Sequence, residues 1–270
     1  MTTQPVSDTW ERGSPYEQYI GRWSRAIAPL FLAWLASPVD QRWLDVGCGT
    51  GALCAAILDR CAPRGVVGVE PSDGFRELAT RNLGERVRFL AGNAASLPLE
   101  DGACDVVVSG LVLNFVPDLP GALAEAKRVT ASGGTIAGYV WDYADGMEVI
   151  KAFWDAAASL DPAAERLHEG ARFVSCNPAA LREAFEAAGL AAVDVTALDV
   201  TARFVDFDDY WRPFLGGQGP APAYAMSLSE EQRAALRARL ETTLAPSGNG
   251  TIALGARAWA VRGSTARTAA

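Results

Sequence analysis

The sequence predicts an α/β fold in which a mostly parallel sheet carries helices on both faces, and three observations support it. Seven short apolar or β-branched runs have the pattern of strands. Helical stretches separate most of these runs, as in folds that build parallel sheets. Half of the 270 residues are apolar, which is enough to bury a sizeable core.

The first half of the chain shows this alternation most regularly. Residues 15–36 place apolar and aromatic residues at helical spacing, so they predict one or two helices. Short apolar runs and helical stretches then alternate, and Ser72 is expected to cap one of the helices. The predicted strands are 42–48, 65–70, 87–92, 104–110 and 133–141, and the predicted helices between them are 52–61, 72–83 and 119–130.

The alternation stops after residue 143. A helical stretch and an irregular segment fill 144–176, and Asn177 with Pro178 opens a further helix over 177–190. A Gly/Pro-rich aromatic stretch, "FDDYWRPFLGGQGPAPAY", predicts a long loop that covers a substrate. The remaining predicted elements are a strand over 191–204, a helix near 229–243 and an antiparallel last strand over 251–263.

These elements predict a single domain, 1–270, with additions to its core. The core is expected over about 37–143 and 177–263, with an N-terminal helical lid over 10–36. The segments 144–176 and 206–250 are expected to be insertions that cover the substrate.

Composition argues against several classes of function. The net charge of −8 disfavours nucleic acid as the main partner, because an acidic chain repels phosphates. Apolar runs fall short of the roughly 20 residues of a membrane span, and the N-terminus lacks the apolar stretch of a signal peptide. Five cysteines without a C-x-x-C motif and a single histidine favour reduced thiols in the cytoplasm and no metal.

The stretch "WLDVGCGTGA", residues 43–52, predicts a ligand close to the backbone. Gly47 permits a tight turn, Gly49 removes a side chain where a ligand approaches, and Gly51 lets a helix begin close to the strand. Glu70 ends the next strand, about 20 residues on, at the spacing of an acid that accepts hydrogen bonds from ribose hydroxyls. We therefore expect an adenosine-containing ligand at the carboxyl ends of the strands.

Two such ligands compete for this loop. The pattern G-C-G-T-G-A also fits the fingerprint of a nicotinamide dinucleotide site. Asp45 stands two residues before the first glycine, where its charge would repel a pyrophosphate but attract a sulfonium and an amino group. A nicotinamide site also gives no role to the antiparallel last strand. A NAD(P)-dependent oxidoreductase stays as the alternative.

The chain resembles class I S-adenosylmethionine (SAM)-dependent methyltransferases in "LDVGCGTG" (44–51), "VEPS" (69–72), "GNAASLPLEDGACDVVVS" (92–109) and "RVTASGGTIAG" (128–138). The resemblance implies a Rossmann-like, seven-stranded, mostly parallel sheet with helical lid insertions. It also implies SAM as cofactor and S-adenosylhomocysteine (SAH) as product.

The resemblance assigns residues to parts of the cofactor. It implies that Asp45, Gly47, Gly49 and Gly51 surround the methionine part, and that Glu70 takes the ribose. Asn93 and Ala94 would meet the adenine amino group; Asn93 replaces the usual Asp, and its side-chain oxygen can still accept. Ser109, Gly110 and Leu111 would form a loop beneath the methionine. The stretch "YIGRWSR" resembles the lid helix of small-molecule methyltransferases such as glycine N-methyltransferase, with Tyr19 and Arg25 at the cofactor-contacting positions.

The expected reaction is an in-line displacement on a small, partly apolar acceptor, with oxygen, nitrogen or carbon as nucleophile. The stretch "SGLVLNF" replaces the N/D-P-P-Y/F tetrapeptide of enzymes that methylate amino groups of DNA bases. A catalytically idle SAM-binding module also stays open. We expect a monomer or homodimer. A general base is needed only for a weakly acidic acceptor, and its weak candidates are His168, Asp142, Tyr143, Asp209 and Tyr210.

Overall fold

The structure is a computed structural model that describes residues 22–217, 219–244 and 250–267. The chain divides into two compact units. The sheet unit comprises Ser24–Trp141, Ser175–Leu198 and residues 258–267. Among the described residues, the helical unit comprises those within Asp142–Val174 and Asp199–Arg257, together with Arg22 and Trp23.

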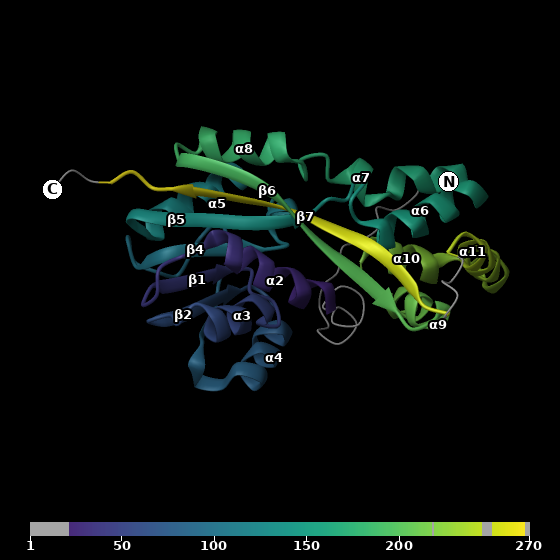
Figure 1. The fold of residues 1–270 in the computed structure, drawn as a ribbon, viewed down its shortest axis with the longest axis horizontal. Helices are drawn as coiled ribbons and strands as arrows, with labels where there is room; N and C mark the ends of the chain where they lie inside the picture. The colour runs from purple at the N-terminus through teal and green to yellow at the C-terminus, as the bar shows by residue number, and fades with distance from the viewer. Residues whose placement is uncertain (1–21, 218, 245–249, 268–270) are drawn as a thin grey trace. The chain divides into compact units, whose positions relative to one another are not determined.

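Seven strands form one sheet in the order β3-β2-β1-β4-β5-β7-β6 (Figure 1). Six strands run parallel and β7 runs antiparallel to β5, so the predicted fold class is confirmed. The strands are β1 (Arg42–Val46), β2 (Gly65–Glu70), β3 (Arg88–Ala91), β4 (Cys104–Gly110), β5 (Thr130–Trp141), β6 (Ala191–Phe204) and β7 (Ile252–Ser264).

Helices cover the sheet on both faces, because the strands are added outward from the central pair β1 and β4 in opposite directions. β1 leads outward to β2 and β3, whereas β4 leads to β5 on the other side, and right-handed crossovers then place α3 and α4 opposite α5. Several of these helices begin at caps that the sequence predicts; the Ser72 hydroxyl accepts from Phe75 N, and the Asn177 amide accepts from Ala180 N. The helices are α2 (Arg22–Leu35), α3 (Ala52–Arg60), α4 (Asp73–Leu83), α5 (Leu119–Val129) and α8 (Pro178–Ala187), with short 3-10 turns η2 (Gly84–Arg86) and η3 (Leu113–Phe115).

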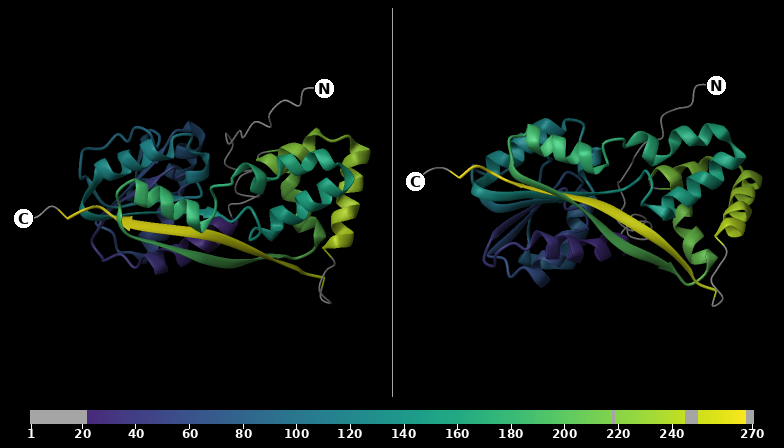
Figure 2. Two further views of the ribbon diagram at one scale, coloured as in Figure 1. Left: turned by 90° about the horizontal axis from the view of Figure 1, so that it is seen from above. Right: turned by 45° about the horizontal axis from the view of Figure 1, so that its top comes forward.

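The helical unit gathers short helices beside the outer parts of β6 and β7 (Figure 2). Its centre is aromatic; the rings of Phe153 and Phe214 stack with centroids 4.6 Å apart. The Tyr210 hydroxyl lies in this core as well. The helices are α6 (Glu148–Leu160), η4 (Pro162–Leu167), α7 (Glu169–Arg172), α9 (Phe207–Trp211), η5 (Arg212–Gly216), α10 (Pro220–Ser227) and α11 (Glu230–Thr243).

The prediction of a long loop from the aromatic Gly/Pro-rich stretch is wrong. Residues 207–216 and 220–227 are helical, because Asp206 caps the first helix and prolines occupy first-turn positions of η5 and α10. Trp211 and Phe214 are buried in the core of the helical unit, so they serve packing there.

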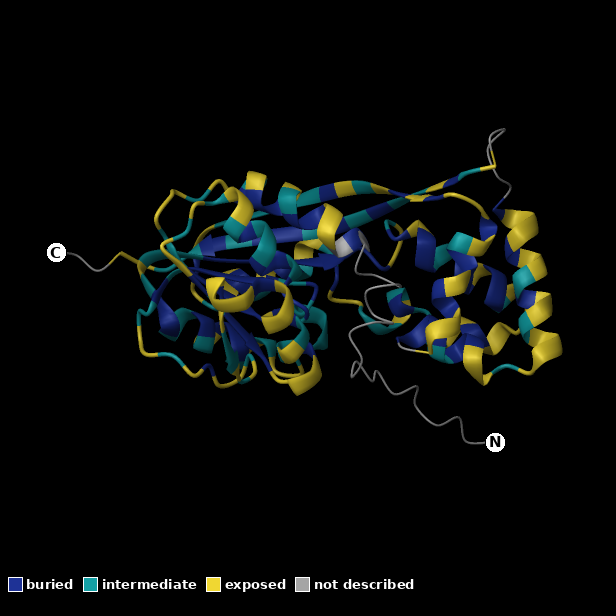
Figure 3. Ribbon diagram, turned by 90° about the horizontal axis from the view of Figure 1, so that it is seen from below, coloured by how far each residue is buried: buried dark blue, intermediate teal, exposed yellow. Residues whose placement is uncertain are grey.

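Burial follows the pattern expected for a covered parallel sheet. The central strands are mainly buried, while the outward faces of the helices are exposed (Figure 3). Across the described ranges, every helix is too short or too polar to cross a bilayer.

Candidate functional site

The glycine loop after β1 is anchored to β2 and leaves space at one glycine. Gly47 N and Cys48 N both donate to Val69 O, at 2.8 and 3.1 Å. All three glycines have positive φ, but a β-carbon at Gly47 would lie 2.7 Å from a Val112 methyl, and one at Gly51 would lie 2.9 Å from Leu83. A β-carbon at Gly49 would meet no atom of the described residues within 4 Å. Gly47 and Gly51 therefore serve packing, and Gly49 borders the open space.

Glu70 is buried at the end of β2 and faces this loop. One carboxylate oxygen accepts from Gly49 N at 3.1 Å, and the other accepts from Ser72 N at 2.9 Å. Burial raises the pKa of Glu70, and the two backbone N–H groups partly offset that rise. Each oxygen has a second acceptor position, so the carboxylate can still accept from a pair of hydroxyls.

Asp45 lies on the neighbouring strand and is almost fully buried. The Cys54 thiol donates to its Oδ2 at 3.2 Å, a contact that the sequence analysis missed because the two residues meet only across the β1–α3 turn. Burial raises the pKa of Asp45 to about 7, since the thiol stabilises the charged form less than water would and Glu70 adds negative charge. A ligand with a positive charge would stabilise the ionised carboxylate.

The end of β4 lies at the same edge of the sheet as the ends of β1 and β2. The Ser109 hydroxyl donates to Val46 O at 2.9 Å, which ties β4 to β1. Leu111 is buried and has φ +63°, a conformation that costs a leucine free energy. Its N–H donates to Tyr139 O at 2.8 Å. The segment Ser109–Leu111 is therefore held between the ends of β1 and β5, and its role beneath the methionine stays a prediction.

Asn93 differs from the expectation. Its side-chain oxygen accepts from Ala95 N at 2.9 Å and Ser96 N at 3.2 Å, so the turn after β3 uses the oxygen that we expected to accept from adenine. Its amide NH₂ is a donor and suits a ring nitrogen instead. Ala94, next to it, is half-buried and lines a small interior cavity of 30 Å³ with Val46 and Ser109.

The predicted lid residues are only partly described. Tyr19 lies outside the described residues. Arg25 lies in the first turn of α2 and is exposed, while Ile27 and Phe31 pack the same helix into the core. The role of both Tyr19 and Arg25 in binding the cofactor stays a prediction.

Two of the weak base candidates bind the start of a turn or helix. His168 Nδ1 accepts from Gly170 N at 2.8 Å and so caps α7, and burial lowers its pKa, which favours the neutral imidazole. The Asp142 carboxylate is buried and accepts from Asp145 N at 3.3 Å. Both side chains stabilise local backbone structure.

The other three candidates also contact neighbouring structure in the helical unit. The fully buried Tyr210 hydroxyl donates to Val149 O at 3.0 Å, and burial raises its pKa, so it stays protonated. Asp209 accepts from Val205 N at 3.2 Å. The Tyr143 ring packs against Phe173 with centroids 5.2 Å apart. A role of these five residues as a base stays a prediction.

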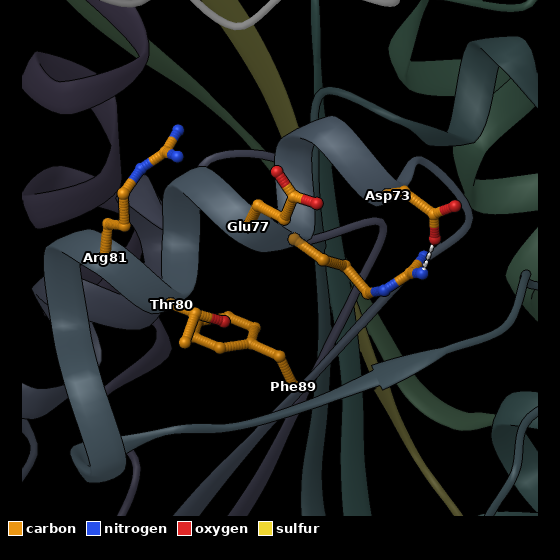
Figure 4. A pocket seen from close by; sticks show the side chains of 6 residues that line it. Asp73, Glu77, Thr80, Arg81 and Phe89 are labelled. Carbon is orange, nitrogen blue, oxygen red and sulfur yellow. Dashed lines mark hydrogen bonds and ion pairs between the residues drawn. The ribbon is translucent and has the colours of Figure 1, made fainter.

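A separate hollow lies beneath α4. It has a volume of 490 Å³, and Figure 4 shows the side chains that line it. Arg76 pairs there with Asp73 and also donates to Glu70 O at 2.6 Å, so it fixes the backbone at the end of β2. Within residues 22–217, 219–244 and 250–267, no three His, Cys, Asp or Glu side chains are grouped as metal ligands.

Comparison with known proteins agrees with this geometry. The family described as "Methyltransferase domain" matches residues 44–138, which contain the glycine loop, Glu70 and Ser109. The malonyl-[acyl-carrier protein] O-methyltransferase of Geobacter sulfurreducens is 30% identical over 233 residues, which cover 83% of this chain and 85% of that protein.

Two solved structures share the fold. YcgJ from Bacillus subtilis has a TM-score of 0.58 at 19% identity, over 92% of this chain and all of that one. Haemonchus contortus phosphoethanolamine N-methyltransferase 2, in complex with SAM, has a TM-score of 0.58 at 14% identity, over 94% of this chain and 57% of that one. With the family match and the G. sulfurreducens relative, the chain belongs to the class I SAM-dependent methyltransferases, enzymes that take their methyl group from SAM.

Proposed function

We propose that this enzyme transfers a methyl group to a small-molecule acceptor by in-line displacement. The cofactor supplies an electrophilic methyl group on a sulfonium. The protein holds the acceptor atom in line with that methyl and excludes water. Family membership removes the support for the oxidoreductase alternative.

One observation carries the proposal: two buried carboxylates lie beside the glycine loop, in which a β-carbon at Gly49 would meet no atom of the described residues. Asp45 and Glu70 lie on adjacent parallel strands, paired through Val46 and Val69. Buried carboxylates are costly unless a donor or a positive charge satisfies them. Glu70 would accept from the ribose hydroxyls, Asp45 would face the charged amino-acid end, and Gly49 would let the ligand contact the backbone.

The remaining cofactor residues follow from the family resemblance. Ser109 and Leu111 would line the methionine, and Asn93 and Ala94 would meet the adenine. Because the oxygen of Asn93 binds its own turn, we propose that its NH₂ group donates to a ring nitrogen of adenine. Tyr19 and Arg25 would complete the site from the lid.

We further propose that the segments 144–176 and 206–250 determine which acceptor is used. They lie outside the matched residues 44–138, and their cores are rich in aromatic side chains that suit a partly apolar small molecule. The related G. sulfurreducens enzyme is named for a malonyl acceptor, so a malonyl thioester belongs among the candidates. A cytoplasmic location rests on the cysteine usage of the sequence.

The test is a panel assay with isotopically labelled SAM. The panel contains 4-nitrocatechol, 4-nitrophenol, a primary amine and a malonyl thioester, and mass spectrometry identifies the product. We expect SAH to raise the melting temperature of the protein and at least one acceptor to gain the label. Stabilisation by NADH but not by SAH contradicts the proposal. SAH binding without turnover of any acceptor supports the catalytically idle module instead.

A further inference from the structure

The turn after β4 contains a buried carboxamide without hydrogen-bond partners. Asn114 lies in η3 and is partly exposed as a residue, but its Oδ1 and Nδ2 are both sealed from solvent and unpaired in the described part of the chain. A carboxamide can accept and donate two hydrogen bonds each. Burying a carboxamide without these hydrogen bonds costs free energy, and native structures seldom contain such an unpaired group without a reason. The stability of the fold therefore does not explain why an asparagine occupies position 114.

This turn lies across the carboxyl ends of the central strands. Val112 covers Gly47 after β1, where a β-carbon would lie 2.7 Å from its methyl group. Leu113 covers Gly138 of β5 in the same way, at 2.8 Å. Since β4 pairs with both β1 and β5, Asn114 sits on the edge where open α/β sheets bind their ligands.

A second observation from the same turn also indicates a ligand. Leu111 holds a positive φ three residues before Asn114, although a leucine is strained there. Such strain persists where surrounding structure enforces it, and it gathers at functional sites. The turn thus has two energetically unfavourable features, the positive φ of Leu111 and the unpaired carboxamide of Asn114.

We propose that the carboxamide of Asn114 binds the methyl acceptor, with Oδ1 accepting from a hydroxyl and Nδ2 donating to an adjacent oxygen. The inference rests on the proposed function and adds the acceptor's chemistry. The cofactor's amino-acid end, ribose and adenine are assigned to Asp45, Glu70 and Asn93, which leaves the acceptor for Asn114. Because Oδ1 and Nδ2 belong to one small group, the matching donor and acceptor must be neighbours on the ligand, as in a catechol.

The transfer then balances as follows. One catechol oxygen forms the new O–CH₃ bond while the S–CH₃ bond breaks, the electron pair stays on sulfur, and the phenolic proton passes to solvent. Asn114 holds the two oxygens so that one of them faces the methyl group.

The test compares Asn114→Leu with the wild type. Replacing an unpaired buried carboxamide by an apolar side chain should leave the melting temperature unchanged or higher. SAH affinity, measured by calorimetry, should not change. Methyl transfer to 4-nitrocatechol should fall by about 100-fold or more in kcat/KM, because a catechol would lose its paired hydrogen bonds.

Two controls separate this role from a structural one. 4-Nitrophenol has the same ring with one oxygen, so the wild type should use it less well and the substitution should affect it less. Asn177→Ala removes the cap of α8, so it should lower the melting temperature and leave kcat/KM unchanged.

Three results overturn the proposal. Asn114→Leu lowers the melting temperature as much as Asn177→Ala does, which means that an internal water holds the carboxamide. The wild type binds SAH but uses 4-nitrocatechol no better than 4-nitrophenol. Asn114→Leu leaves kcat/KM for 4-nitrocatechol unchanged. Absence of SAH binding by the wild type would instead refute the proposed function.

Discussion

The two units bury similar polar side chains and use them differently. In the sheet unit, Asp45 and Glu70 lie at strand ends, and burial raises the pKa of both carboxyls. Each keeps acceptor positions that no hydrogen bond within the described ranges fills. In the helical unit, His168 caps a helix, Asp142 accepts from its own turn and Tyr210 donates to a backbone carbonyl.

Backbone position explains this difference. A parallel strand ends at an open edge, where the next backbone groups turn away and a side chain can serve a ligand. A residue before a helix meets N–H groups that lack partners in the first turn, so its side chain is used to satisfy them. Residue type alone therefore does not distinguish a ligand-binding group from a cap, and the following four substitutions test the distinction.

The largest effect is expected at Gly49. A valine there would project into the open space next to the loop, so SAH binding should fall below detection in calorimetry. The protein itself should lose only about 1–2 kcal/mol of stability from the positive φ. Gly84→Val is the control, since Gly84 also has a positive φ and its β-carbon position has no atom within 4 Å in the part of the chain that the structure describes. If Gly49→Val retained its affinity for SAH, the result would contradict binding of the ligand at this loop.

The next effect is expected at Glu70. Glu70→Ala should weaken SAH binding by about 1–3 kcal/mol, because buried hydroxyls lose a charged acceptor. Calorimetry measures the change, and Glu77→Ala, an exposed glutamate on α4, serves as the control. Equal affinities for the two variants would refute the ribose assignment.

The burial of Asp45 should make the stability of the protein depend on pH. Burial raises the pKa of Asp45 to about 7 in the folded protein from 3.8, so the folded state retains a proton that the unfolded state has lost between these values. The stability of the cofactor-free protein should thus fall as pH rises from about 4 to 7, by at most about 1.4 kcal/mol per pH unit. Urea unfolding at several pH values should show a weaker decline in Asp45→Asn. The same decline in both proteins contradicts the buried carboxyl.

The smallest effect is expected at His168. Asn is a good cap, so His168→Asn should keep α7 and change kcat and the melting temperature little. The pH profile of kcat should also stay the same. A large loss of kcat at unchanged melting temperature, with a lost ionisation in the profile, would make His168 the general base and end the contrast between the units.

Much of the fold could be predicted because its signals are local. The strand before Gly47 and the helix caps at Ser72 and Asn177 depend on neighbouring residues, and each was found. The helices over 207–227 were missed, because a dense run of Gly, Pro and aromatic residues has the composition of a loop until tertiary packing buries its rings. β5 also begins at Thr130, before the predicted residue 133.

The sequence alone was enough for the seven strands, since apolar periodicity is a property of short segments, and its resemblance to a family was enough for SAM as the cofactor. Binding of the ligand at the carboxyl ends of the strands stays a prediction. Tertiary structure decided that Gly49 rather than Gly47 borders open space and that the oxygen of Asn93 serves its own turn. It also decided that the two polar side-chain atoms of Asn114 are buried without a partner among the described residues. These facts depend on which atoms, often distant along the chain, come into contact, and on how little water reaches them.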